Sequence, residues 1–301
     1  MKTTTLGNTG LNVSALGFGA MHFSLSGRPP EAQGLDVLHR VLDLGVTFID
    51  TADAYCRDET DKHHNERIIQ KALATYPGDA SRVVVATKGG IMRPGGSWTR
   101  NGNPDHLRQT IRESHAALGG DRPISLWQHH AVDPNYSVDV SLEPVREAVR
   151  DGLIRFVGVS NYSVEQIERA REVVEVVSVQ NQYSPWHRRP ERDGVLAYCE
   201  AEGLTFLPWS PLGGSSRAKR LDQIDALATL AREKGISPQR LVIAWLMARS
   251  PCILPIPGSS RRDNTEDLLA AVDVTLTEDE VQRIGCTTNC TGAPRKLLQP
   301  K

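Results

Sequence analysis

The segment VLDLGVTFID, residues 41–50, joins a helix to a short strand across one glycine. Its first half has the apolar spacing of a helix, and Gly45 suits the position just past a helix end. The run VTFID is apolar on both faces, which is typical of a parallel strand covered by helices. The same arrangement returns in VRDGLIRFVGVS (149–160) and CEAEGLTFLPWS (199–210). These repeats predict a chain in which helices alternate with parallel strands.

The same pattern, followed along the whole chain, predicts eight strands with helices between them. The strands are expected at 15–20, 47–50, 83–87, 124–128, 156–160, 176–180, 204–208 and 252–256. The helices are expected at 31–44, 65–74, 104–118, 141–150, 163–172, 193–201, 222–248 (broken at Gly235) and 263–271. Eight alternations within about 250 residues predict an α/β fold, the (β/α)8 TIM barrel. Before the first strand, TTTLGNTGLNVS (3–14) predicts a β-hairpin that caps the barrel bottom.

The overall composition is that of an ordinary soluble protein. Of 301 residues, 39% are hydrophobic and 24% charged, and the net charge of −1 gives no reason to expect a nucleic-acid partner or an anionic membrane surface. No linker or low-complexity run divides the chain, so residues 1–301 are expected to form a single domain. The N-terminus lacks the apolar core of a signal peptide, and no apolar run is long enough to span a membrane.

The cysteines also favour a cytoplasmic protein. Their number is odd, they are scattered, and none forms a CxxC pair; they are Cys56, Cys199, Cys252, Cys286 and Cys290. This usage is typical of reduced thiols rather than of a disulfide framework.

Polar and aromatic residues collect where the expected strands end. The set comprises Asp50, Tyr55, Lys88, His129, His130, Ser160, Asn161, Gln180, Asn181, Trp209 and the run GSSRR (258–262). Each alone has a structural explanation, such as a turn cap, a loop aromatic, a core histidine or a lysine that reaches solvent along its own stem. In a barrel, however, the chemistry lies at the C-terminal ends of the strands. There these residues would place an acid, a phenol, an ammonium and an imidazole around one mouth.

Several segments together resemble the aldo-keto reductase family. FIDTADAY (48–55) and HNERIIQKAL (64–73) are similar to that family's Asp and Tyr motif, VVVATKGG (83–90) to its lysine strand, and SLWQHHAVDP (125–134) to its histidine segment. IRFVGVSNYS (154–163), VQNQYSP (179–185), LPWSPLGG (207–214) and PIPGSSR (255–261) are similar to its cofactor-binding segments. The resemblance extends from about residue 3 to about residue 285, in family order. It implies the TIM barrel and the NADPH-dependent reduction of an aldehyde or ketone, with NADP(H) as cofactor.

The resemblance implies four catalytic residues: Asp50, Tyr55, Lys88 and His130. The histidine position, counted from Ser125, falls on His130 rather than His129. Reduction places negative charge on the carbonyl oxygen, and a phenol is a weak acid at neutral pH. The expected role of Lys88 is to lower the pKa of Tyr55, with Asp50 pairing with the buried ammonium and His130 acting as a second donor.

The resemblance also implies an extended cofactor site without a GxGxxG loop. Ser160, Asn161 and Gln180 would bond the carboxamide, Trp209 would stack on the nicotinamide, and Ser210 and Leu212 would lie near the pyrophosphate. Gly258, Ser259, Ser260 and Arg261 precede a helix, whose N-terminus suits phosphate. Arg261 is expected to bind the 2′-phosphate and so to favour NADPH over NADH, and Asn264 is a candidate for adenine.

The substrate pocket is expected in loops 21–30, 91–103 and 186–192, with Trp98 and Trp186 as candidate lining residues; local packing explains these aromatics equally well. Three features depart from the family pattern. Cys56 follows the tyrosine in place of glycine, the loop to Asn65 is longer than common, and Leu268 stands where an adenine-contacting asparagine is usual.

Two alternatives to a reductase are consistent with parts of the sequence. His63–His64, His129–His130 and Asp58 or Asp61 suggest a metal hydrolase, but the first strand lacks an HxH pair and adjacent histidines on a strand point to opposite sides. We therefore expect no metal. Relatives that act as regulatory β subunits of potassium channels keep the cofactor site with little turnover. A complete set of four catalytic residues favours an enzyme acting on a small carbonyl compound; the oligomeric state is left open.

Overall fold

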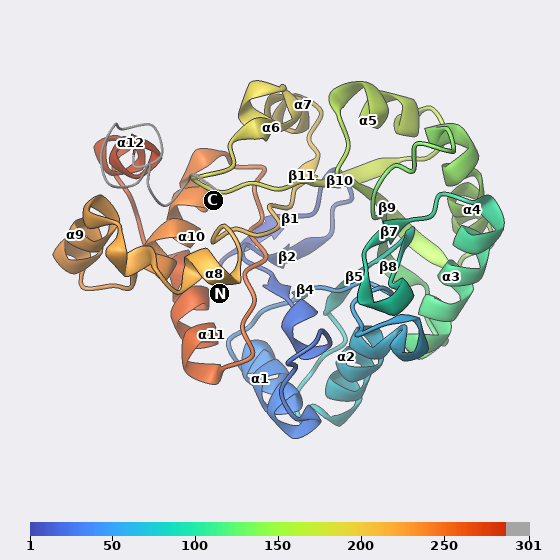
Figure 1. Ribbon diagram of the computed structural model, residues 1–301, viewed down its shortest axis with the longest axis horizontal. Helices are drawn as coiled ribbons and strands as arrows, with labels where there is room; N and C mark the ends of the chain where they lie inside the picture. Colours follow the sequence, from blue (N-terminus) through green and yellow to red (C-terminus); the bar gives the residue numbers. More distant parts are fainter. Residues whose placement is uncertain (287–301) are drawn as a thin grey trace.

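The computed structural model describes residues 1–286 and contains a curled, seven-stranded parallel sheet surrounded by helices (Figure 1). The strand order is β11-β10-β9-β8-β5-β4-β3. The strands are β3 (Phe18–Gly19), β4 (Phe48–Asp50), β5 (Val84–Gly89), β8 (Ile124–His129), β9 (Ile154–Ser160), β10 (Val176–Gln180) and β11 (Thr205–Phe206). All neighbouring pairs are parallel, and the prediction of a (β/α)8 barrel is confirmed.

The segment 252–256, expected to be the eighth strand, closes the barrel without forming a regular strand. It bonds to β11 through Phe206 N to Cys252 O (2.8 Å) and Leu254 N to Phe206 O (2.9 Å). On the other side the N–H of Gly17 donates to Pro255 O and that of Gly19 to Pro257 O, both at 2.9 Å. Proline has no N–H to donate, so this segment cannot complete a ladder. The expectation of a regular strand here was therefore wrong, although its closing role holds.

The helices lie outside the sheet, close to their expected positions. They are α1 (Glu31–Asp43), α2 (His64–Thr75), α3 (Pro104–Ala117), α4 (Val138–Arg150), α5 (Val164–Arg171), α7 (Val195–Ala201), α9 (Asp225–Lys234), α10 (Pro238–Arg249), α11 (Arg262–Leu269) and α12 (Glu278–Cys286). The predicted break at Gly235 is confirmed, because this glycine ends α9 with φ of 66°. Short elements that were not expected are α6 (Arg189–Arg192), α8 (Ser215–Ala218) and the hairpin of β6 (Ile91–Met92) and β7 (Thr99–Arg100).

The N-terminal hairpin pairs β1 (Thr3–Thr5) with β2 (Asn12–Ser14) in antiparallel register and closes one end of the barrel, as predicted. Its residues Leu6 and Val13 are fully buried and pack in one cluster with barrel-interior residues that include Phe48 and Val177. A second, larger cluster lies between the sheet and the helices. The hairpin therefore seals the barrel bottom, and the opposite end is left for the site.

Side-chain caps fix the residue at which two of the helices begin. Asn103 caps α3 by accepting hydrogen bonds from the N–H groups of Asp105 and His106. Ser163 and Gln166 form a capping box that starts α5 three residues after β9. The short connection from β9 to α5 carries Asn161, one of the candidate site residues.

Two further expectations concern the whole chain. Cys56, Cys199, Cys252 and Cys286 are free thiols, while Cys290 lies outside the described residues. Within residues 1–286, none of the helices has the length and apolar character needed to cross a bilayer.

Candidate active site

The lysine at the end of β5 is fully buried, and all three of its donors have partners. Its Nζ lies 2.7 Å from Asp50 Oδ2, 2.7 Å from the carbonyl oxygen of Thr51 and 3.1 Å from Tyr55 Oη. A buried ammonium is costly unless it is paired, and here an ion pair and two hydrogen bonds meet that requirement. Lys88 is therefore held against the phenol rather than extended to solvent.

Asp50, at the end of β4, is fixed on both carboxylate oxygens. Oδ2 accepts from Lys88, while Oδ1 accepts from the side-chain amides of Gln180 (2.8 Å) and Gln128 (3.4 Å). The sequence did not single out Gln128, although its place at the end of β8 put it at the same edge of the sheet. These amides hold the carboxylate in the orientation that reaches the lysine.

His130, and not His129, lies beside Tyr55. Its ring centroid is 5.9 Å from that of Tyr55 and nearly perpendicular to it. The ring of His129 instead bonds to Tyr162 Oη (2.6 Å) and stacks on Trp127. Burial, together with the charge of Lys88, lowers the pKa of His130 well below its usual value. His130 is therefore a neutral imidazole at neutral pH, able to donate one N–H.

The pKa of Tyr55 lies above the ordinary value for tyrosine. Burial is the largest cause, the ammonium of Lys88 acts in the opposite direction, and the carboxylate of Asp50 raises the pKa further. Lys88 thus lowers the pKa of Tyr55 as expected, but burial and Asp50 outweigh it, so the net pKa is raised. Lys88 still makes the phenol a stronger acid than burial alone would leave it.

Residues expected to hold the nicotinamide end of a cofactor lie next to His130. Asn161, in a left-handed conformation with φ of 62°, donates from Nδ2 to the carbonyl oxygen of His130 (2.9 Å). Its Oδ1 accepts from the indole N–H of Trp209 (3.0 Å), which fixes that half-buried ring at the strand ends. Ser160 is buried, and Gln180 is the residue bonded to Asp50. One hydrogen-bonded chain thus connects Trp209 to His130.

Two segments are expected to contact the phosphates of a cofactor: residues 210–212 and residues 258–261. Ser210 has φ of 50°, and Leu212 follows it in the loop that precedes α8. Gly258 approaches the backbone of Gly19 so closely that a Cβ atom would lie 2.0 Å from its carbonyl oxygen. Ser259 Oγ accepts from the N–H of Arg261 (3.1 Å), and Ser260 O accepts from the side chain of Gln33 (2.7 Å). Only glycine therefore fits at position 258.

The start of α11 presents exposed polar side chains, and the departure at Leu268 has a structural counterpart. Arg261 and Asn264 are exposed at the N-terminal end of the helix. Leu268 is buried in the core between helices and sheet, so it does not replace an asparagine at the surface. Contact of Asn264 with an adenine stays a prediction.

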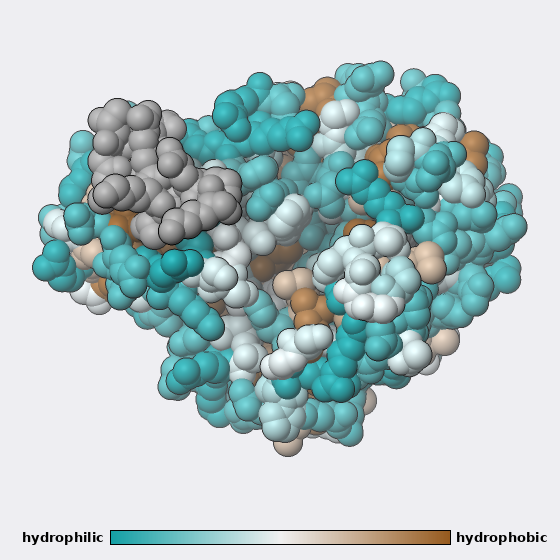
Figure 2. All heavy atoms as spheres, in the orientation of Figure 1, coloured by the Kyte–Doolittle hydropathy of each residue, from teal (hydrophilic) through white to brown (hydrophobic). Residues whose placement is uncertain are grey.

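Of the two tryptophans expected in the substrate pocket, Trp98 lies against the candidate catalytic tyrosine. Its ring is 6.4 Å from that of Tyr55 in an edge-to-face arrangement and is 48% exposed. The guanidinium of Arg93, a residue the sequence did not single out, stacks on the same indole at 3.8 Å. Trp186 is half-buried beside Arg217, at 5.3 Å. Figure 2 shows the surface hollowed near its centre, with hydrophobic residues at the floor.

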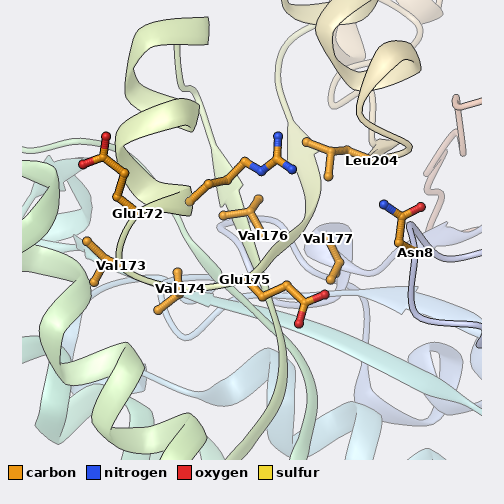
Figure 3. Close-up of a pocket in the computed structure, with 9 residues that line it drawn as sticks. Asn8, Glu172, Val173, Val174, Glu175, Val176, Val177 and Leu204 are labelled. Atoms are coloured by element: carbon orange, nitrogen blue, oxygen red, sulfur yellow. The ribbon is translucent and has the colours of Figure 1, made fainter.

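A separate hollow opens at the other end of the barrel, where β10 begins (Figure 3). Its lining residues are Asn8, Arg171, Glu172, Val173, Val174, Glu175, Val176, Val177 and Leu204. This set contains none of the four catalytic candidates. In the described part of the chain, no group of three or more His, Cys, Asp or Glu side chains is arranged to hold a metal ion.

Comparison with known proteins gives one consistent answer. The family model described as "Aldo/keto reductase family" matches residues 15–286. An uncharacterized oxidoreductase, C215.11c of Schizosaccharomyces pombe, is 35% identical over 272 residues, covering 89% of this chain and 84% of the relative.

Solved structures agree with this match. The thermostable aldo-keto reductase Tm1743, in complex with the inhibitor epalrestat, superposes with a TM-score of 0.79 at 27% identity, covering 95% of this chain and 100% of that one. The holo form of aldo-keto reductase AKR11C1 from Bacillus halodurans gives a TM-score of 0.76 at 25% identity, covering 95% of this chain and 96% of that one.

Proposed function

The chain belongs to the aldo/keto reductase family and is an oxidoreductase, and from this we propose that it uses NADPH to reduce an aldehyde or ketone to an alcohol. The observation that carries the proposal is the buried group in which Lys88 contacts both Asp50 and Tyr55 Oη, with His130 against the same phenol. The reaction is reversible in principle, because the phenolate of Tyr55 can take back the proton that it gives.

The bound nicotinamide would supply the hydride, and the chain's own residues would bind the carbonyl and deliver one proton. Tyr55 Oη donates its proton to the carbonyl oxygen as negative charge develops there. Lys88 stabilises the phenolate that is left, and Asp50 keeps the ammonium in place. The neutral His130 donates an N–H to the same oxygen and orients the substrate.

The residues present fit a nicotinamide cofactor. Trp209 presents a half-buried aromatic ring bonded to Asn161. Ser160 and Gln180 lie at the ends of the neighbouring strands β9 and β10. The close approach at Gly258 leaves backbone next to the start of α11, where helix N–H groups favour phosphate. We assign the 2′-phosphate to Arg261, and therefore NADPH rather than NADH as the preferred cofactor.

The direct test is the loss of NADPH absorbance with a panel of aldehydes and ketones. Turnover of at least one carbonyl is expected, and the ranking of the panel begins to define the substrate. Tight NADPH binding with no turnover of any carbonyl would contradict the proposal. It would instead support a regulatory, cofactor-binding protein.

The cofactor assignment predicts that Arg261→Ala weakens NADPH binding about tenfold, with little change for NADH, which lacks the 2′-phosphate. Within residues 1–286 the guanidinium of Arg261 has no carboxylate partner, so it is available to a phosphate. Arg262→Ala is the matched control, because the neighbouring Arg262 pairs with Asp36 and Glu266. Dissociation constants from fluorescence titration decide the point, and equal NADPH affinity in the two variants would remove the 2′-phosphate role from Arg261.

A further inference from the structure

A cluster of five charged side chains lies beneath the loop that carries Tyr55. Its members are Asp53, Lys62, His63, Glu66 and Glu113. Asp53 and Glu66 are fully buried, and His63 is nearly so. Two carboxylates buried in one cluster call for a physical explanation, since buried charges are costly without partners.

The carboxylates of the cluster pair with Lys62 and His63, two adjacent residues of the segment between Tyr55 and Asn65. Lys62 Nζ lies 3.4 Å from Asp53 Oδ2, 2.9 Å from Thr110 Oγ1 and 4.0 Å from Glu113 Oε2. The ring of His63 bridges Glu66 (2.5 Å from Nδ1) and Glu113 (3.1 Å from Nε2). These cations therefore come from the segment that joins the tyrosine to α2.

Backbone bonds tie the cluster to both catalytic residues. The N–H of Asp53 donates to the carbonyl oxygen of Lys88 (3.1 Å), and the N–H of His63 donates to that of Asp53 (2.9 Å). Asp53 Oδ1 accepts from the N–H of Ala54 (2.6 Å), the residue before Tyr55. Asp53 Oδ2 has no hydrogen-bond partner and faces only the ammonium of Lys62. A change at Asp53 is thus transmitted directly to the tyrosine loop.

We propose that Asp53 is a positioning residue for the proposed reaction: its carboxyl holds the tyrosine loop, and its charge, balanced by Lys62, sets how readily Tyr55 releases a proton. This inference rests on the proposed function and extends it. The site that carries the chemistry then includes a second, buried carboxyl besides Asp50, supplied with its counter-charge by Lys62 and His63.

The charges that act on these groups come from every element around them. Burial raises the pKa of Asp53 to about 7, Lys62 and His63 oppose this, and Glu66 adds to it. Burial lowers the pKa of His63, but Glu66, Asp53 and Glu113 outweigh this and leave it raised. Burial also raises the pKa of Tyr55, which Lys88 lowers and which Asp50 and Asp53 raise further.

The sign of the pH effect follows from these directions. As the pH rises through about 7, Asp53 becomes negative. Its charge then raises the pKa of Tyr55 and makes the phenol a weaker acid. Since general acid catalysis follows the strength of the acid only in part, reduction should slow about threefold across neutral pH.

The test compares the pH dependence of kcat for reduction in wild type, Asp53→Asn and Asp58→Asn. Asparagine at position 53 keeps the acceptor for the N–H of Ala54 but cannot become charged. Wild type and Asp58→Asn are expected to show the threefold step near neutral pH, because Asp58 is only half-buried and its carboxylate accepts from Thr60, outside the cluster. Asp53→Asn is expected to lose the step while binding NADPH as wild type does. A step that persists in Asp53→Asn would overturn the inference, and absence of turnover in wild type would count against the proposed function alone.

Two further measurements keep the inference testable if Asp53→Asn fails to fold or if no carbonyl is turned over. Carboxyl 13C NMR of aspartate-labelled wild type should show one resonance that titrates near pH 7; its absence would overturn the inference without any activity measurement. His63→Asn suits the left-handed conformation at this position (φ of 64°) and removes one counter-charge. It should move that resonance to higher pH, whereas a merely structural histidine would leave it in place.

Discussion

Replacing Tyr55 with phenylalanine is expected to lower kcat for carbonyl reduction by at least about 10²-fold, because the change removes the hydroxyl that is proposed to protonate the carbonyl oxygen. The phenylalanine ring keeps the edge-to-face contacts with Trp98 and His130, so the shape of the site should persist. Tyr55 Oη bonds to Lys88, and we assign it no contact with the cofactor. The dissociation constant for NADPH should therefore stay within about twofold of wild type.

The matched control for this substitution is Tyr198→Phe. Tyr198 lies outside the candidate site, because its hydroxyl accepts a hydrogen bond from Arg171 (2.9 Å) on the outer side of the barrel. Steady-state kinetics on the best carbonyl of the panel should show the full loss in Tyr55→Phe and wild-type turnover in Tyr198→Phe. Near-normal turnover in Tyr55→Phe would show that another residue is the general acid, and His130 would be the first candidate.

Lys88→Met is expected to damage both catalysis and folding. It removes the ammonium that favours the phenolate, so kcat should again fall by about 10²-fold or more. It also leaves Asp50 buried without its counter-charge, at 3% exposure, and held only by two amides. Breaking a buried pair by removing one partner typically costs about 3–5 kcal/mol, so denaturant unfolding should show a loss of that size.

Lys71→Met is the control, because Lys71 pairs with Glu31 where both side chains are half exposed. Exposed pairs contribute little, so this variant should unfold close to wild type. Equal stability of the two variants would show that the Asp50–Lys88 pair does not hold this part of the barrel together.

Much of the fold could be predicted because the repeating unit has a local cause. Gly45, Gly152 and Gly203 each follow the end of a helix and each has a positive φ, as the repeated helix–glycine–strand arrangement requires. The strands that follow them are β4, β9 and β11, in register with their neighbours. Hydrophobicity alone did not reveal that the segment 252–256 is irregular, since its apolar run resembles those of the strands. Only its prolines, which cannot donate to a ladder, distinguish it.

The grouping of the candidate site was predictable for the same reason, but its electrostatics were not. Asp50, Lys88 and His130 come together because each lies at or just after the end of a parallel strand. The net pKa of Tyr55 depends on how deeply the phenol is buried, and no local pattern records burial of a loop residue. The cluster around Asp53 could not be predicted from the sequence, because Glu113, which pairs with His63, is far away in the chain on α3.

The central claim is that this chain moves a hydride from NADPH to a carbonyl carbon, and the most direct measurement uses NADPH deuterated at C4 of the nicotinamide. Wild-type protein would be incubated with the aldehydes and ketones of the panel, and the alcohols analysed by mass spectrometry. The account predicts an alcohol that carries deuterium on the carbon that was the carbonyl, formed in step with the loss of NADPH absorbance. NADPH that binds tightly but yields no deuterated alcohol from any carbonyl would contradict it.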